Sequence, residues 1–168
     1  MEFYLLDSEL NKKHLIDIYS SAIWVPRYND IGDCELVIDA TSENLKKIKE
    51  CKYIARDDDD MVCKIEKIEI KTDVENGDQL IVTGADIKKI LNQRIVMKQT
   101  NFNGLVEDYI RTLINDAIIN PTNQDRKINN FLLDEKRGYT EKIREQVTYD
   151  NVGEKIQELC KQYGWGYK

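Results

Sequence analysis

The hydrophobic and polar positions in the first half of the chain predict strands. Residues 3–6 are a short apolar run, residues 15–19 alternate with polar residues, and residues 22–28 are rich in aromatic and β-branched residues. Further strands are predicted at 34–38 and 52–56. A short helix is predicted at 41–50, where Leu45 and Ile48 fall on one face. Thr41 or Ser42 can cap its first turn. The first half is therefore expected to be a sheet with one helix.

A long hairpin follows, and the apolar positions change parity along its first strand. Met61, Cys63 and Ile65 come first, followed by Ile68 and Ile70. A β-bulge near Glu66 and Lys67 would reconcile the two sets. Asn76 followed by Gly77 suits a type I′ turn, which requires positive φ at both central residues. The strand after this turn is expected to pair back onto the strand before it.

From Gly84 onward the hydrophobic period changes from two to about 3.6, which indicates helices. The pattern predicts a short helix after Asp86, a longer one capped by Asn103 and a final one capped by Asn151. Two more strands are predicted at residues 128–133 and 143–149.

The predicted fold class is α+β, with two domains that meet near residue 84 or 85. Residues 1–84 are expected to form a β-barrel or a strongly curved antiparallel sheet, and residues 85–168 a smaller α+β domain. Residues 164–168 look like the start of a further strand, so the chain is expected to continue in a longer protein.

The composition limits the partners. Charged residues make up 33% of the 168 residues, but their signs are mixed and the net charge is −6. Nucleic-acid binding needs a net basic face, so no nucleic-acid partner is predicted. No run approaches the ~18 apolar residues of a membrane span. The N-terminus has no basic region before its short apolar run, so neither membrane insertion nor a secretory signal is predicted.

Residues that could bind a metal are few. The cysteines lack C-x2-C spacing, and His14 is the only histidine. We interpret the cysteines as reduced structural residues of a cytoplasmic protein and expect no metal and no cofactor. The acidic run 57–60 offers oxygen ligands for calcium, but it lacks the D-x-D-x-D-G frame and is better explained as a solvated turn.

Candidate catalytic groups are equally sparse. His14 has neither a nucleophile nor an orienting acid among its sequence neighbours. The carboxylate sets Asp30/Asp33/Glu35 and Glu66/Glu69 fit the residue types of glycoside hydrolysis, but chance pairs are expected among 31 acidic residues. The common phosphate, dinucleotide, serine-hydrolase and zinc-protease motifs are absent from the sequence. The chain is therefore not predicted to be an enzyme, and no catalytic residue is assigned.

Trp24, Arg27 and Tyr28 are the strongest interface candidates, because these residue types dominate buried interaction hot spots. In a purely structural interpretation, Trp24 packs into the barrel and Arg27 pairs with an acid such as Glu35. Both interpretations can hold together where a core continues into an oligomer interface.

The segment around these residues reads W-x2-R-Y-x3-G-x2-E-L-x-I from Trp24 to Ile38. This pattern resembles the N-terminal signature of a family of siphophage and prophage tail proteins, with Cys34 in place of the usual Phe. A second family motif, G-x-D/S-L-x-x-L-L-x-x-R-x, is matched by the segment that begins at Gly84 and ends at Ile95. Helices downstream of it fit as well, so the resemblance covers most of the chain.

The resemblance implies a structural component of a tail hub, tail tip or baseplate, active in virion assembly and host attachment. Such hubs are expected to be rings, most simply trimers, of β-barrel domains with α+β insertions, in contact with other tail proteins. The implied location is the virion, after assembly in the bacterial cytoplasm. The alternatives are a module that binds a host-surface glycan or protein, and a tail-associated peptidoglycan hydrolase or peptidase.

Overall fold

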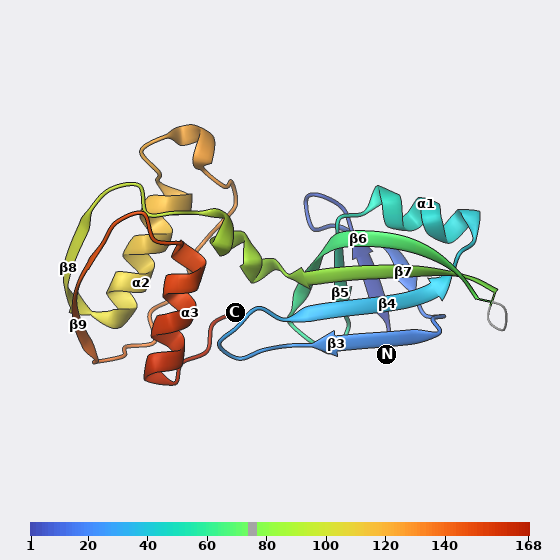
Figure 1. Ribbon diagram of the computed structural model, residues 1–168, viewed down its shortest axis with the longest axis horizontal. Helices are drawn as coiled ribbons and strands as arrows, with labels where there is room; N and C mark the ends of the chain where they lie inside the picture. Colours follow the sequence, from blue (N-terminus) through green and yellow to red (C-terminus); the bar gives the residue numbers. More distant parts are fainter. Residues whose placement is uncertain (74–76) are drawn as a thin grey trace. The chain divides into compact units, whose positions relative to one another are not determined.

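The protein is described by a computed structural model that covers residues 1–73 and 77–168 (Figure 1). It contains two compact units, Met1–Ile87 together with Lys168, and Lys88–Tyr167. Both units combine strands with helices, and the strands pair antiparallel, which confirms the α+β class.

The first unit is built on a seven-stranded antiparallel sheet with the order β2-β1-β5-β6-β7-β4-β3. Its strands are β1 (Phe3–Leu6), β2 (Lys12–Ile16), β3 (Ser21–Val25), β4 (Asp33–Asp39), β5 (Tyr53–Arg56), β6 (Val62–Asp73) and β7 (Gly77–Asp86). The helix α1 (Ser42–Glu50) begins after Thr41, whose hydroxyl accepts a hydrogen bond from the Asn44 amide as predicted.

This sheet is strongly curved, but it is not a closed barrel. In a flat sheet β1 and β3 would lie about 24 Å apart, five strand spacings. The rings of Phe3 on β1 and Trp24 on β3 are instead only 5.8 Å apart between centroids. Aromatic side chains make this contact, whereas the outermost strands β2 and β3 share no backbone pairing in the described residues. The barrel prediction is therefore wrong, because closure requires a continuous ladder.

The hairpin of β6 and β7 has the predicted irregularity. The register shifts between Ile65 and Lys67, which confirms the β-bulge. Pairing of the two strands continues to Asp73 and Gly77, as expected for a hairpin. The predicted turn at Asn76 and Gly77 includes a residue outside the described ranges.

Two strands of the first unit are shorter or earlier than predicted. The strand predicted at 15–19 is β2, because Asp7 closes the preceding turn early by accepting hydrogen bonds from the amides of Glu9 and Asn11. The strand predicted at 22–28 is β3, which ends at Val25 because Pro26 cannot donate to a ladder.

The second unit packs helices against a two-stranded antiparallel sheet. The sheet pairs β8 (Thr100–Leu105) with β9 (Lys142–Val147). The helical segments are η1 (Ile87–Gln93), α2 (Val106–Ile114), the π-helical turn η2 (Asn115–Ile119) that continues α2, η3 (Gln124–Arg126) and α3 (Val152–Tyr163). Asn151 caps α3 as predicted, by accepting a hydrogen bond from the Glu154 amide. The core of the second unit includes Tyr109, Val152 and Ile156.

Three predictions for this unit are wrong. Asn103 lies within β8, and Leu105 occupies the N-cap of α2. Residues 128–133 form no strand, since their alternation arises from Phe131 and Leu133 packing on the core without a partner strand. Residues 164–168 form no strand either, because the ring of Trp165 is buried against that of Tyr139, 4.1 Å away between centroids.

Candidate functional site

Trp24 lies at the inner side of the sheet edge. Its ring is half-buried, tilted against Phe3, and the guanidinium of Arg56 lies 5.7 Å from its centroid. The buried indole nitrogen Nε1 has no hydrogen-bond partner within the described residues. Trp24 therefore contributes to the core of the first unit, as the structural interpretation predicts, and leaves one buried donor unpaired.

Arg27 fixes the turn between β3 and β4. Its guanidinium binds the carboxylate of Asp33, with 3.0 Å between Nη2 and Oδ2, and also donates to the carbonyl of Ile31. The hydrogen bond to Asp33 raises the pKa of Arg27 above its usual value. The partner is thus Asp33 rather than Glu35, the acid named from the sequence. Tyr28, in the same turn, is 69% exposed.

The glycines of the two sequence motifs lie where backbones approach closely. A Cβ on Gly32 would come within 2.6 Å of the Val25 carbonyl oxygen, and one on Gly84 within 2.5 Å of the Lys64 carbonyl oxygen. The amide of Asp86 donates to the carbonyl of Gly32 across 2.9 Å. The two motifs therefore meet in space, and their glycines serve the packing of the sheet.

The two outer edges of the sheet differ in charge. Edge strand β2 carries Lys12 and Lys13, which discourage pairing with another strand. Edge strand β3 has the sequence Ser-Ala-Ile-Trp-Val without a charge, and its Ile23 is 52% exposed. Ile18, just before β3, and Tyr28, just after it, are also exposed. We call the segment 18–28 the β3 edge.

The other candidates have structural partners. Asp57 accepts a hydrogen bond from the Glu2 amide, and Asp59 accepts one from the Met61 amide. His14 lies 3.4 Å from a carboxylate oxygen of Glu50. Within residues 1–73 and 77–168, no group of three His, Cys, Asp or Glu side chains has metal-binding geometry.

The four cysteines are free and buried. A hydrogen bond with Cys34 raises the pKa of the Cys63 thiol well above its usual value, and burial adds to this. Burial raises the pKa of Cys160 to about 11. Because the thiolate is the nucleophile, these two protonated thiols are poor candidates for catalysis at neutral pH.

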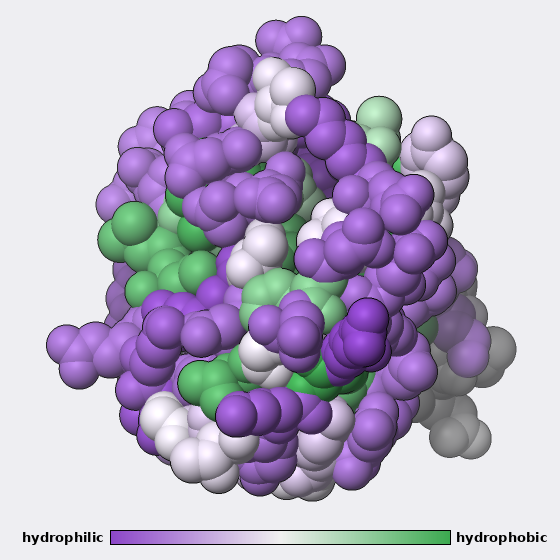
Figure 2. All heavy atoms as spheres, turned by 90° about the vertical axis from the view of Figure 1, so that its left-hand side faces the viewer, coloured by the Kyte–Doolittle hydropathy of each residue, from purple (hydrophilic) through white to green (hydrophobic). Residues whose placement is uncertain are grey.

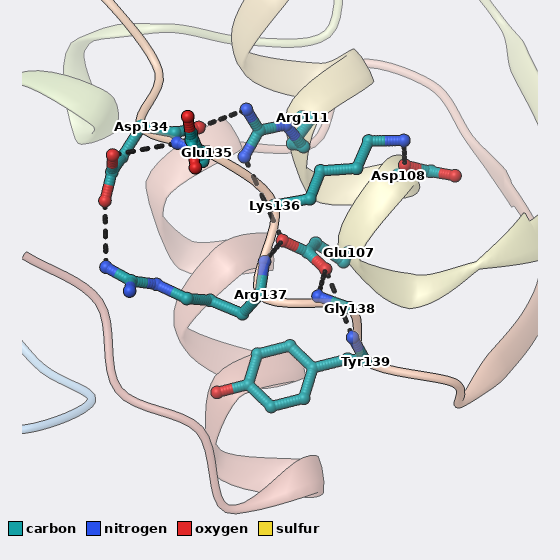
Figure 3. A network of polar contacts seen from close by, with 9 residues as sticks. All are labelled: Glu107, Asp108, Arg111, Asp134, Glu135, Lys136, Arg137, Gly138 and Tyr139. Atoms are coloured by element: carbon teal, nitrogen blue, oxygen red, sulfur yellow. Dashed lines mark hydrogen bonds and ion pairs between the residues drawn. The ribbon is translucent and has the colours of Figure 1, made fainter.

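In the second unit, a polar network at the start of α2 holds a long loop (Figure 3). The Glu107 carboxylate accepts hydrogen bonds from three consecutive backbone amides, those of Arg137, Gly138 and Tyr139, at 2.7, 3.0 and 3.3 Å. Arg111 donates to the carbonyl of Asp134. Desolvation raises the pKa of Glu107, but the three amides and the charge of Arg111 together bring it below its usual value. The network therefore fixes this loop.

We call residues 127–141, between η3 and β9, the Leu132 loop. Leu132 is 87% exposed, whereas its neighbours Phe131 and Leu133 pack on the core. An irregular segment of this length is uncommon unless it serves a function. Sequence reasoning assigned part of this loop to a strand and did not identify Glu107 as its anchor.

A groove of about 480 Å³ lies on the same unit, between residues 95–100 and the end of α2. Its floor includes Leu113 and Ala117, and its rim includes the exposed side chains of Ile95 and Met97 and the cationic Lys98. We call it the Met97 groove. The adjoining π-helical turn η2 is of a type often found at functional sites.

Comparison with known proteins relates the chain to phage tail proteins. The profile of a family described as Siphovirus ReqiPepy6 Gp37-like protein matches residues 2–168. The crystal structure of prophage tail protein gp18 from Listeria monocytogenes EGD-e is similar, with a TM-score of 0.57 and 14% sequence identity. The similarity covers 98% of this chain and 46% of that one, so the chain spans about half of that neighbour's length. No curated protein matches the sequence. No helix in the described residues is long and apolar enough to cross a membrane.

Proposed function

Because the chain belongs to the Siphovirus ReqiPepy6 Gp37-like protein family, we propose that it is a structural component of the tail hub, tail tip or baseplate. The family and the shared fold indicate a phage or prophage tail protein. In this proposal the chain forms a ring, most simply a trimer, that contacts other tail proteins in the virion. Its role is in assembly and host attachment, without catalysis.

The β3 edge is the observation that carries the proposal. An open strand edge presents unpaired backbone groups that readily bind another strand. Here strand β3 itself carries no charge, and the exposed Ile18 and Tyr28 lie before and after it, whereas the opposite edge carries lysines. A ring needs a contact between two different surfaces that closes on itself, and the β3 edge can supply one of these two surfaces.

The three candidate residues take separate roles in this proposal. Tyr28 is the exposed anchor that a neighbouring subunit would bury. Arg27 holds the turn in shape through Asp33. Trp24 supports the strand from the inner side. The interface therefore rests on a backbone edge that these side chains fix in position.

Light scattering on the chain and on Ile23→Lys tests the proposal. The parent is expected to have the mass of a closed ring, and Ile23→Lys to shift it toward monomer, because a charge on the edge blocks strand pairing. Ile70→Lys is the matched control, since Ile70 is similarly exposed but lies on β6, which β7 and β4 separate from β3.

A parent that stays monomeric at all concentrations would contradict ring formation by the chain. It would direct attention to binding of a host-surface glycan. Equal loss of mass in both variants would exclude the β3 edge as the contact.

A further inference from the structure

The Leu132 loop holds one apolar side chain out in solvent on a fixed backbone. Packing of Phe131 and Leu133 anchors the chain on both sides of Leu132. The contacts of Arg111 with Asp134 and of Glu107 with the amides further along hold the rest of the loop (Figure 3). A preorganised side chain loses little conformational entropy when a partner buries it, so Leu132 is suited to act as an anchor.

The Met97 groove has the complementary character. Buried Leu113 and Ala117 form an apolar floor, and Met97 on the rim is 55% exposed. Its volume of about 480 Å³ lies in the range of sites that take a bulky apolar group. Apolar patches are separated by hydrophilic residues on the face seen in Figure 2, so the exposed apolar surface there is local rather than continuous.

Charge indicates what fits the groove. Lys98 lies on the rim, and Glu135 lies three residues after Leu132. Within the described part of the chain, neither side chain takes part in an ion pair. The lining also contains the cation Arg126 and the carboxylate of Asp116, so positive charge exceeds negative charge there. An apolar anchor followed by a carboxylate on one surface thus matches an apolar groove with a net positive lining on the other.

We propose that Leu132 of one copy of this chain inserts into the Met97 groove of a second copy, with Glu135 beside Lys98. Anchor and groove are different surfaces of one unit, so the contact is heterologous and repeats from copy to copy. The inference rests on the self-association in the proposed function and adds a second contact to the one at the β3 edge. A single side chain gives a weak contact alone, so it acts within an assembly.

Disulfide cross-linking between two tagged variants, Leu132→Cys and Met97→Cys, tests the contact. Mixed and oxidised, they are expected to form a cross-linked heterodimer, whereas each variant alone does not. The four native cysteines are buried and do not compete. A mixture of Met97→Cys with Leu132→Ser, in place of Leu132→Cys, gives the background yield of cross-linked heterodimer. In a binding assay, Leu132→Ser is expected to weaken association through the groove at least about tenfold.

Charge reversal supplies the second measurement. Glu135→Lys and Lys98→Glu are each expected to lower the cross-linked yield, and a mixture carrying both reversals to restore it. No heterodimer above background, or no recovery in the doubly reversed mixture, overturns the proposal. If these fail while the ring mass still depends on Ile23, only the anchor and groove are wrong. If cross-linking succeeds while the parent forms no ring, the proposed function fails and this contact stands.

Discussion

Glu107 shows how one carboxylate organises a loop that has little secondary structure. Three amide donors converge on it, so a neutral side chain there leaves donors poorly satisfied. Glu107→Gln is expected to lower the free energy of unfolding by about 2 kcal/mol, measured by urea denaturation. Asp108→Asn is the control, because the Asp108 carboxylate pairs with Lys136 at the surface, and the substitution is expected to cost less than about 1 kcal/mol. Equal losses would contradict the role of Glu107.

The difference in stability between the parent and Glu107→Gln is expected to depend on pH. The folded-state pKa of Glu107 is lowered, so its contribution to stability is complete above the unfolded pKa of about 4.3. That contribution is lost as the pH falls through the folded pKa. The stability difference between the parent and Glu107→Gln is therefore expected to be constant near neutral pH and to shrink below about pH 4.

Trp24 is the residue whose substitution separates packing from interface roles. Its ring contacts Phe3 and closes the curve of the sheet, so Trp24→Ala is expected to lower the free energy of unfolding by about 3 kcal/mol. Trp24→Phe keeps an aromatic ring beside Phe3 and removes the unpaired Nε1 donor, and should cost less. A loss below ~1 kcal/mol for Trp24→Ala would show that the ring matters mainly to a partner.

At the scale of elements, the sequence predicted strands correctly where the hydrophobic pattern of a segment comes with a neighbouring strand that pairs with it. The parity change between Ile65 and Ile68 predicted the bulge, because one face of a strand packs on the core and the other faces solvent. An extra residue is needed to keep the apolar side chains on the same face. Sequence reasoning failed at β8, whose polar sequence carries no alternation signal and whose strand exists because β9 pairs with it. It also failed at 128–133, where alternation without a partner produced an anchored loop.

The candidate site was predictable only in part for the same reason. Trp24 and Tyr28 are informative as residue types, but only the strand order shows that β3 is an outer edge. The Met97 groove joins residues about twenty positions apart, and nothing local marks it. The amides held by Glu107 lie thirty residues further along the chain. Such surfaces form when segments distant in the sequence come together in the fold, and the hydrophobic periodicity of each segment does not predict which segments meet.

At the scale of the whole molecule, we propose two domains with a boundary near residue 84 or 85. Most buried hydrophobic residues fall into two clusters, one from Phe3 to Val82 and the other from Leu91 to Trp165, and no residue belongs to both. Since each cluster is a hydrophobic core of its own, we propose that the two parts unfold separately.

Calorimetry on the chain is expected to resolve two transitions. Trp24→Ala should lower the melting temperature of only one of them, and Glu107→Gln that of only the other, because each residue serves a different core. Separate expression of 1–87 and 88–168 assigns the transitions. A single transition that both substitutions shift equally would mean that the chain folds as one cooperative unit, and that its two cores are parts of one domain.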